Sequence, residues 1–191
     1  MPFKLLNTWL DEEKASGAPN PHQAVLSTVM PGSAPHGRVV AIREISDQGL
    51  LFFTQRRTRK VDEIKYNPQA TITFWLELKQ RQVIIEGQIE VLSDADNAIY
   101  WETYPREAQI RFAAYAPTSG QPIGSKQILE EKRGKIAAEY VDKALPLSPD
   151  YCGFRLRPNR FVFYVYCTSE LSDVCEYIFS RHTWHKQILS P

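Results

Sequence analysis

The amino-acid sequence predicts a mostly β protein, an antiparallel barrel with helices placed outside it. Runs of β-branched and aromatic residues recur along the chain, and several are joined by connections of hairpin length. Helical stretches fall between groups of strands, whereas a doubly wound parallel sheet needs a helix after nearly every strand. These two observations favour an antiparallel barrel with peripheral helices over a parallel α/β fold.

The first half of the chain supplies five predicted strands and two helices. A helix is predicted over 3–15, and a second starts at Thr58, which is suited to cap it, and stops at Asn67-Pro68. A hairpin is expected around Lys79-Gln80-Arg81. The predicted strands are 24–30, 38–45, 50–54, 70–78 and 82–92.

The second half adds three predicted helices and then returns to strands. The helices are 93–104, 105–114 and 125–144, and the strands are 152–156, 160–167, 175–179 and 183–189. No internal repeat, low-complexity tract or long linker interrupts the chain. A single domain over 1–191 is therefore expected, with an N-terminal helix and loop in 1–20.

Composition narrows the classes of function. The net charge of +1 gives no long-range field for nucleic acid or an anionic membrane. Cys152, Cys167 and Cys175 form no C-x-x-C pair and leave an odd thiol, which favours a reducing compartment. No signal peptide or apolar membrane-spanning run is recognised. A cytoplasmic protein without nucleic-acid or membrane partners is expected.

The segment from Thr54 to Lys60 is a candidate anion site. A strand ends in a hydroxyl, and the helix that starts at Thr58 carries Arg59 and Lys60 in its first turn. Cations there oppose the helix dipole unless an anion is bound. Free N–H groups, two basic side chains and the Thr54 hydroxyl suit a phosphate. The alternative is a solvated basic turn.

Arg38 and Arg43 bracket an otherwise apolar strand. Their odd separation should point them to opposite faces of the sheet, so one would reach a ligand while the other reaches a second site or a partner chain. The alternative is that both are strand-end residues whose charges extend to water.

Several familiar catalytic patterns are absent from the sequence. There is no G-x-S-x-G, Walker loop or G-x-G-x-x-G. His182 and His185 lie three residues apart on a predicted strand, so their rings point to opposite faces and no metal site is expected.

The order and spacing of a set of short motifs resembles the pyridoxamine 5′-phosphate oxidase family, from Ala24 to Pro191. The matching pieces are Arg38 to Arg43, Phe53-Thr54, Thr58-Arg59-Lys60, Asn67-Pro68, Arg81-Gln82-Val83 with Gly87, and the segments 105–110, 146–147 and 153–155.

This resemblance implies an FMN-binding split β-barrel that forms a homodimer, with FMN across the subunit interface and 145–191 as dimerisation strands. The phosphate of FMN would be held by Phe53-Thr54 and Arg59-Lys60, at the candidate anion site. The implied flavin-binding residues are Arg38, Val39, Val40, Ala41, Ile42, Arg43, Phe53, Thr54, Arg59, Lys60, Gln82, Ser119 and Tyr164.

The substrate side departs from the family pattern. Of four positions that hold pyridoxal phosphate, Arg43 and Tyr100 keep the family's chemistry, while Tyr104 replaces an arginine and Ala108 a serine. The family's R-L-H-D segment reads Glu170-Leu171-Ser172-Asp173 here, and Val174 replaces a flavin-contacting arginine. The substrate-side candidates are Arg43, Tyr100, Tyr104, Glu170 and Ser172.

Three hypotheses follow from these departures. The first is an FMN-dependent oxidoreductase that oxidises a small amine or alcohol other than the standard substrate. The second is a genuine pyridoxine or pyridoxamine 5′-phosphate oxidase. The third is a non-catalytic protein that binds flavin or another small molecule. A deazaflavin or haem in place of FMN also stays open, because related split barrels hold those groups.

Overall fold

The computed structural model describes residues 1–191 and divides them into two compact units. The barrel unit comprises Met1–Phe52, Glu63–Glu90 and Phe154–Pro191, and the helical unit comprises Phe53–Asp62 and Val91–Gly153. The helices are α1 (Pro2–Ala15), α2 (Arg59–Tyr66), η1 (Glu77–Lys79), α3 (Asp94–Glu102), α4 (Arg106–Tyr115) and α5 (Lys126–Glu139). The strands are β1 (Gln23–Thr28), β2 (His36–Ser46), β3 (Gly49–Gln55), β4 (Gln69–Leu76), β5 (Arg81–Val91), β6 (Tyr151–Val165), β7 (Asp173–Ser180) and β8 (Thr183–Leu189).

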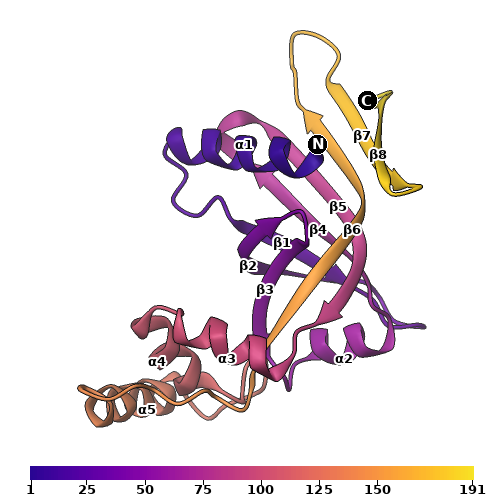
Figure 1. Cartoon of the computed structure of the whole chain (residues 1–191). Coiled ribbons are helices and arrows are strands. Elements are labelled where there is room, and N and C mark those ends of the chain that lie inside the picture. Colours follow the sequence, from indigo (N-terminus) through magenta and orange to yellow (C-terminus); the bar gives the residue numbers. More distant parts are fainter. The chain divides into compact units, whose positions relative to one another are not determined.

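The strands close a six-stranded barrel, so the fold predicted from the sequence is confirmed. The order along the sheet is β3-β2-β1-β4-β5-β6-β7-β8, and an additional pairing of β3 with β6 closes the ring. β7 and β8 continue beyond β6 as an antiparallel hairpin (Figure 1). The predicted hairpin of β4 and β5 is present, with Leu76 opposite Arg81.

One strand prediction was wrong. Residues 152–156 and 160–167 were expected to be separate strands, but β6 is continuous from Tyr151 to Val165 and runs through Pro158. A glycine on the neighbouring strand accommodates this passage. A Cβ on Gly87 would lie 2.1 Å from the carbonyl oxygen of Arg157 and 2.8 Å from Cα of Pro158. Only a residue without a side chain allows the two backbones to approach so closely.

Helix α5 is shorter than predicted, ending at Glu139 instead of residue 144. The side chain of Arg106, at the start of α4, donates a hydrogen bond to the carbonyl oxygen of Tyr140. A cationic donor at the C-terminal end of a helix satisfies a carbonyl that has no partner within the helix and complements the helix dipole. Lys143 then turns back to the same residue through a backbone hydrogen bond of 3.3 Å.

In the barrel unit, α1 is fastened to the β4–β5 turn by a buried carboxylate. Glu13 is only 3% exposed, and its two oxygens accept the backbone N–H groups of Leu78 at 2.9 Å and Lys79 at 3.1 Å. Arg81 pairs with Glu12 and lies over the ring of Trp9, 4.7 Å from its centroid. Hydrogen bonds, an ion pair and a cation–π contact therefore hold α1 against the β4–β5 turn, in addition to the apolar face of the helix.

Three neighbouring strands, β5, β6 and β7, are joined by one arginine between two carboxylates. Arg160 on β6 lies 2.6 Å from Glu86 on β5 and 2.5 Å from Glu176 on β7. Gln187 on β8 donates a second hydrogen bond to Glu176. The hydrogen bond from Arg160, followed by that from Gln187, lowers the pKa of Glu176 from its usual 4.5.

The helical unit contains α3, α4 and α5 (Figure 1), and an aromatic core joins residues of these helices. Trp101, Phe112 and Tyr151 are at most 4% exposed, and the ring centroids of Trp101 and Tyr151 are 5.0 Å apart. The indole N–H of Trp101 donates to the carbonyl oxygen of Leu145 at 3.0 Å, which satisfies its polar group inside the core.

Candidate functional site

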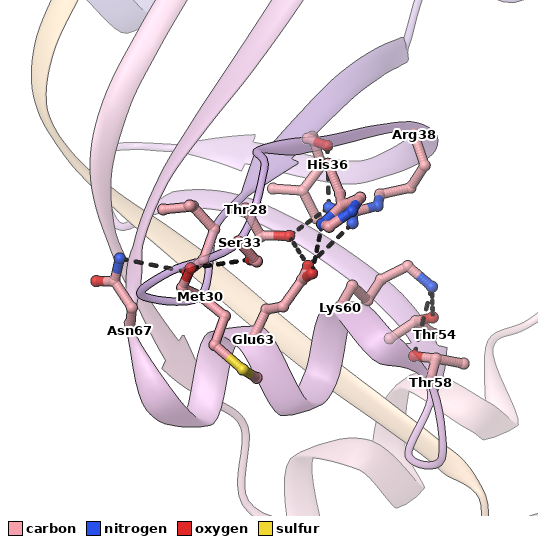
Figure 2. Close-up of polar contacts among 12 residues, drawn as sticks. Thr28, Met30, Ser33, His36, Arg38, Thr54, Thr58, Lys60, Glu63 and Asn67 are labelled. Atoms are coloured by element: carbon pink, nitrogen blue, oxygen red, sulfur yellow. Dashed lines mark hydrogen bonds and ion pairs between the residues drawn. The ribbon is translucent and has the colours of Figure 1, made fainter.

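The candidate anion site lies in the helical unit, where β3 ends and α2 begins. Lys60 Nζ lies 3.0 Å from Thr54 Oγ1 and 3.4 Å from Thr58 Oγ1, so one ammonium group and two hydroxyls meet there (Figure 2). Thr58 also donates its hydroxyl hydrogen to the carbonyl oxygen of Gln55 at 2.9 Å. The chain therefore turns from strand to helix around a small polar cluster, as the sequence predicts for this segment.

Two of the basic residues of this segment, Arg56 and Arg57, differ from Lys60 in their contacts. Arg56 donates to Pro149 O at 3.0 Å and lies 2.6 Å from a carboxylate oxygen of Asp94. Arg57 lies 3.5 Å from Asp150. These two arginines fasten the loop to the start of α3 and to the segment before β6. Lys60 instead contacts the hydroxyls of Thr54 and Thr58, and an ammonium group at this place suits an anionic ligand.

Gln55 is a buried residue of this loop that the sequence analysis did not single out. Gln55 is only 1% exposed, and its side-chain Oε1 accepts a hydrogen bond from the backbone N–H of Ser119 at 3.2 Å. Its Nε2 is buried without a hydrogen-bond partner. Buried polar groups of this kind are rare and concentrate at functional or strained positions. The only available signal was a polar residue at the end of an apolar strand.

The predicted aromatic candidates of the helical unit pack with the core. The ring of Phe53 is stacked on Tyr151 at 4.8 Å and lies 5.2 Å from Tyr100. Tyr104 lies 6.3 Å from Trp101 and 6.0 Å from Tyr151. Both Tyr100 and Tyr104 are half-buried, so each combines a packed ring face with a part that solvent reaches.

Tyr115 shows that this cluster is poorly solvated. Burial, and then the neighbouring Tyr104, raise the pKa of the Tyr115 phenol above its usual 10.0, while Arg111 opposes the shift. A phenol in such surroundings stays protonated and offers an O–H donor.

In the barrel unit, Arg38 belongs to a network built around a buried carboxylate (Figure 2). Its Nη2 lies 3.1 Å from Glu63 Oε2, and its Nη1 lies 2.5 Å from Thr28 Oγ1 and 3.2 Å from Leu26 O. Thr28 donates its hydroxyl hydrogen to Glu63 at 2.5 Å, and His36 Nδ1 lies 2.6 Å from the other carboxylate oxygen. Sequence reasoning identified Arg38 alone, because its partners lie on β1 and α2, away from Arg38 along the chain.

The remaining predicted residues of β2 alternate between the two faces of the sheet. Val40 and Ile42 are buried at 8% and 4% exposure, so they can offer a ligand only their backbone groups. Val39 is 62% exposed, and Ala41 and Arg43 are also exposed. The half-buried Arg38 and the exposed Arg43 thus face opposite sides, and the pairing register shifts between Ile42 and Glu44, beside Arg43.

The other barrel-unit candidates lie on β5, on β6 and in the loop after β6. Gln82 is half-buried and opposite Trp75 in the β4–β5 ladder. Tyr164 is half-buried with its ring centroid 4.3 Å from that of Tyr166. Glu170 is exposed, and Ser172 Oγ accepts the backbone N–H of Cys167 at 3.2 Å. Ser172 thus stabilises its own loop.

The predicted site residues are shared by the two units. Phe53, Thr54, Arg59, Lys60, Tyr100, Tyr104 and Ser119 belong to the helical unit, and Arg38 to Arg43, Gln82, Tyr164, Glu170 and Ser172 belong to the barrel unit. Within the helical unit, direct contacts join Thr54 to Lys60 and Phe53 to Tyr100. None of the helices has the length and apolar character needed to cross a membrane.

Comparison with known sequences gives consistent matches along the chain. The family model described as pyridoxamine 5′-phosphate oxidase matches residues 10–161. A pyridoxine/pyridoxamine 5′-phosphate oxidase of Alteromonas mediterranea is 33% identical over 191 residues, covering 100% of this chain and 89% of that protein. A protein of the same description from Synechocystis sp. is 30% identical and covers 100% and 88%.

Comparison with solved structures gives the same fold. PhzG from Burkholderia lata 383, solved in complex with tetrahydrophenazine-1-carboxylic acid, has a TM-score of 0.88 at 24% identity and covers 100% of this chain and 92% of its own. A pyridoxamine 5′-phosphate oxidase-related, FMN-binding protein from Nostoc punctiforme has a TM-score of 0.80 at 18% identity and covers 98% and 96%.

Proposed function

The chain belongs to the pyridoxamine 5′-phosphate oxidase family, and from this premise we propose that it is an FMN-dependent oxidoreductase. Its proposed substrate is a small amine or alcohol other than pyridoxamine 5′-phosphate. The observation that carries the cofactor proposal is the meeting of Lys60 Nζ with the hydroxyls of Thr54 and Thr58 at the start of α2.

The residues present fit a flavin nucleotide phosphate. Lys60 supplies a point charge, Thr54 and Thr58 supply hydroxyls, and the first turn of α2 supplies N–H groups and the positive end of its dipole. Arg59 is proposed as a second phosphate ligand. The other proposed flavin contacts are Arg38 to Arg43, Phe53, Gln82, Ser119 and Tyr164. Bound FMN would accept a hydride from a substrate C–H next to nitrogen or oxygen and pass the electrons to an acceptor.

The protein's own contribution is position and electrostatics. Val40 and Ile42 are buried and would present backbone groups to the flavin, while Phe53, fixed by stacking on Tyr151, would limit the access of water. Tyr100 would orient the substrate through its half-exposed phenol. By the family pattern we also propose a homodimer with FMN at the subunit interface.

The substrate side supports a change of substrate class. Ala108 is 7% exposed and has no side-chain hydrogen-bonding group, and the ring of Tyr104 packs against Trp101. Neither replaces the bidentate grip that an arginine offers a phosphate. Glu170 is an exposed carboxylate where the family has a cation. Beside a phosphate dianion, such a charge reversal costs on the order of several kcal/mol at an effective dielectric near 20.

A substrate amine fits these substitutions better than a phosphate ester. Glu170 would pair with a cationic nitrogen, and the phenols of Tyr100 and Tyr104 would contact a ring. The two alternatives are retained pyridoxamine 5′-phosphate oxidase activity, with phosphate-binding groups supplied by other residues, and flavin binding without catalysis.

The visible spectrum of the purified protein tests this proposal. It is recorded with and without added FMN, and candidate substrates are then added anaerobically. The panel contains pyridoxamine 5′-phosphate, its unphosphorylated form, small amines and alcohols, and a partly reduced aromatic heterocycle carrying a carboxylate. Bleaching by an unphosphorylated compound, with the flavin left oxidised by pyridoxamine 5′-phosphate, is the expected result.

Each other outcome has a distinct meaning. Bleaching by pyridoxamine 5′-phosphate would establish the parent activity and refute the role given to Glu170. A bound flavin that no donor reduces would favour the non-catalytic alternative. Failure to bind FMN would refute the cofactor proposal itself.

A further inference from the structure

The buried carboxylate of Glu63 has no role in the proposed chemistry, yet it contacts Arg38, which is a proposed flavin-binding residue. Glu63 lies on α2 and is 1% exposed, while Thr28 lies on β1 and Arg38 on β2. A carboxylate removed from water must be compensated by cations and hydrogen-bond donors. Here Thr28 and Arg38 provide that compensation through hydrogen bonds, which ties the helix to two strands, and His36 Nδ1 lies 2.6 Å from the other carboxylate oxygen.

The contacts define which part of the Arg38 guanidinium is already used. Nη1 meets Thr28 Oγ1 and Leu26 O, and Nη2 meets Glu63 Oε2. Because Thr28 Oγ1 and Glu63 Oε2 are themselves 2.5 Å apart, they engage the end of the guanidinium that carries Nη1 and Nη2. The Nε–H and the second Nη2 hydrogen, which share the side edge of the group, have no protein acceptor.

This free edge has the geometry of an oxyanion receptor. Two parallel N–H groups of a guanidinium bind two oxygens of a phosphate or carboxylate in a fork arrangement. The Arg38 side chain is 21% exposed, so its charge is not fully enclosed. Three acceptors hold the other end of the group, and the rotamer freedom that a ligand would otherwise have to restrict is already lost.

We propose that Glu63, assisted by Thr28, is a positioning residue that holds Arg38 with this edge available to the phosphate of FMN. The inference rests on the proposed function and deepens it. Glu63 does not contact the ligand; it fixes the orientation of the Arg38 guanidinium. Thr28 links the two side chains, because its hydroxyl accepts a hydrogen bond from Arg38 and donates one to Glu63.

The test compares FMN with riboflavin, which lacks the phosphate. Dissociation constants of both flavins are measured by fluorescence quenching on flavin-free wild type, Glu63→Gln and Thr28→Val. We expect each variant to weaken FMN about tenfold, the order of one charge-assisted hydrogen bond, and to leave riboflavin within about twofold. The conservative Thr28→Ser keeps the hydroxyl and is expected to restore the wild-type ratio.

Glu13→Gln is the matched control. Glu13 is another carboxylate buried in the barrel unit, but it serves the backbone of Leu78 and Lys79 and does not contact Arg38. A general loss of stability would lower the affinity for both flavins in all variants, whereas the proposal requires a selective loss of FMN in Glu63→Gln and Thr28→Val alone. Equal effects on FMN and riboflavin, or none, would overturn it.

Failure of the proposed function gives a different signature. If wild type binds neither flavin, the cofactor assignment is wrong, and the receptor is then tested with inorganic phosphate. Thermal stabilisation by phosphate that is present in wild type and Glu13→Gln, and absent in Glu63→Gln, would retain the role of Glu63. Equal stabilisation of all three proteins would refute it.

Discussion

Lys60 Nζ lies 3.0 Å from Thr54 Oγ1, so a charge in the first turn of α2 is held beside the last hydroxyl of β3. A lysine at this place opposes the helix dipole in the absence of an anion. A phosphate bound at this helix start would complement both the ammonium group and the dipole. The following predictions depend on this cluster and on the surrounding fold.

Replacing Lys60 should impair the binding of phosphorylated flavin. Lys60→Met removes the ammonium group and keeps the aliphatic length, and we expect the dissociation constant for FMN to rise at least about tenfold. Lys65→Met, an exposed lysine in the last turn of the same helix, is the control and should bind FMN as wild type does. Fluorescence titration measures both, and equal affinities would argue against a phosphate at this helix start.

Restoring the family's cations should restore its substrate. In the double variant Glu170→Arg, Ser172→His, we expect kcat/KM for pyridoxamine 5′-phosphate to rise at least about tenfold, because a repulsive contact becomes attractive. The loop hydrogen bond from Cys167 to Ser172 is lost in this variant, so stability is measured in parallel. Asp142→Arg, at another exposed position, controls for the change in net charge.

Two glycine-to-alanine substitutions should have opposite effects on stability. In Gly87→Ala the new Cβ would lie 2.1 Å from a backbone oxygen, and we expect a loss of roughly 2–4 kcal/mol in the free energy of unfolding. In Gly134→Ala, on helix α5, nothing lies within 4 Å, and a gain of about 0.5–1 kcal/mol is expected. Urea denaturation measures both, and a neutral Gly87→Ala would contradict the close passage of β5 and β6.

Acid should remove the contribution of Glu176. Its pKa in the folded protein is lowered below 4.5 by the Arg160 hydrogen bond first, so the folded state binds fewer protons than the unfolded state as the pH falls. The stabilisation is therefore present above pH 4.5 and is lost as the pH falls through the folded value.

The comparison of wild type with Glu176→Gln isolates this group. At pH 7 we expect the variant to be less stable by roughly 1–3 kcal/mol, since an ionic hydrogen bond becomes a neutral one. The gap should narrow as the pH falls below 4.5 and through the lowered pKa of the folded protein. Denaturant unfolding at a series of pH values measures the gap, and a constant gap would show that ionisation of Glu176 plays no part.

The sequence was informative where local rules act alone. The opposite faces of Arg38 and Arg43 and the helix stop at Asn67-Pro68 were predicted correctly, because strand periodicity and helix termination depend on neighbouring residues. The continuity of β6 across Pro158 was missed, since it depends on Gly87, about 70 residues earlier. The prediction that α5 continues to residue 144 was also wrong. The helix ends at Glu139, and Arg106, 34 residues before Tyr140, donates a hydrogen bond to the Tyr140 carbonyl oxygen.

The same distinction applies to the candidate site. Lys60, Thr54 and Thr58 were found because they lie within seven residues of chain. Glu63 and Thr28 were missed because nothing in the sequence pairs them with Arg38 before the strands and α2 are placed in space. Short-range motifs thus indicate where a ligand contacts the chain, while the residues that restrain those contacts appear only in three dimensions.

The hydrogen bonds from two backbone N–H groups to Glu13 also allow the local undocking of α1 to be measured. The amide protons of Leu78 and Lys79 are shielded by a side chain of α1, not by a ladder of the barrel. In hydrogen–deuterium exchange they would follow the undocking of that helix, while the amides paired between β4 and β5 would wait for the sheet to separate. Two adjacent residues thus report how often the N-terminal helix lifts away, independently of the unfolding of the barrel.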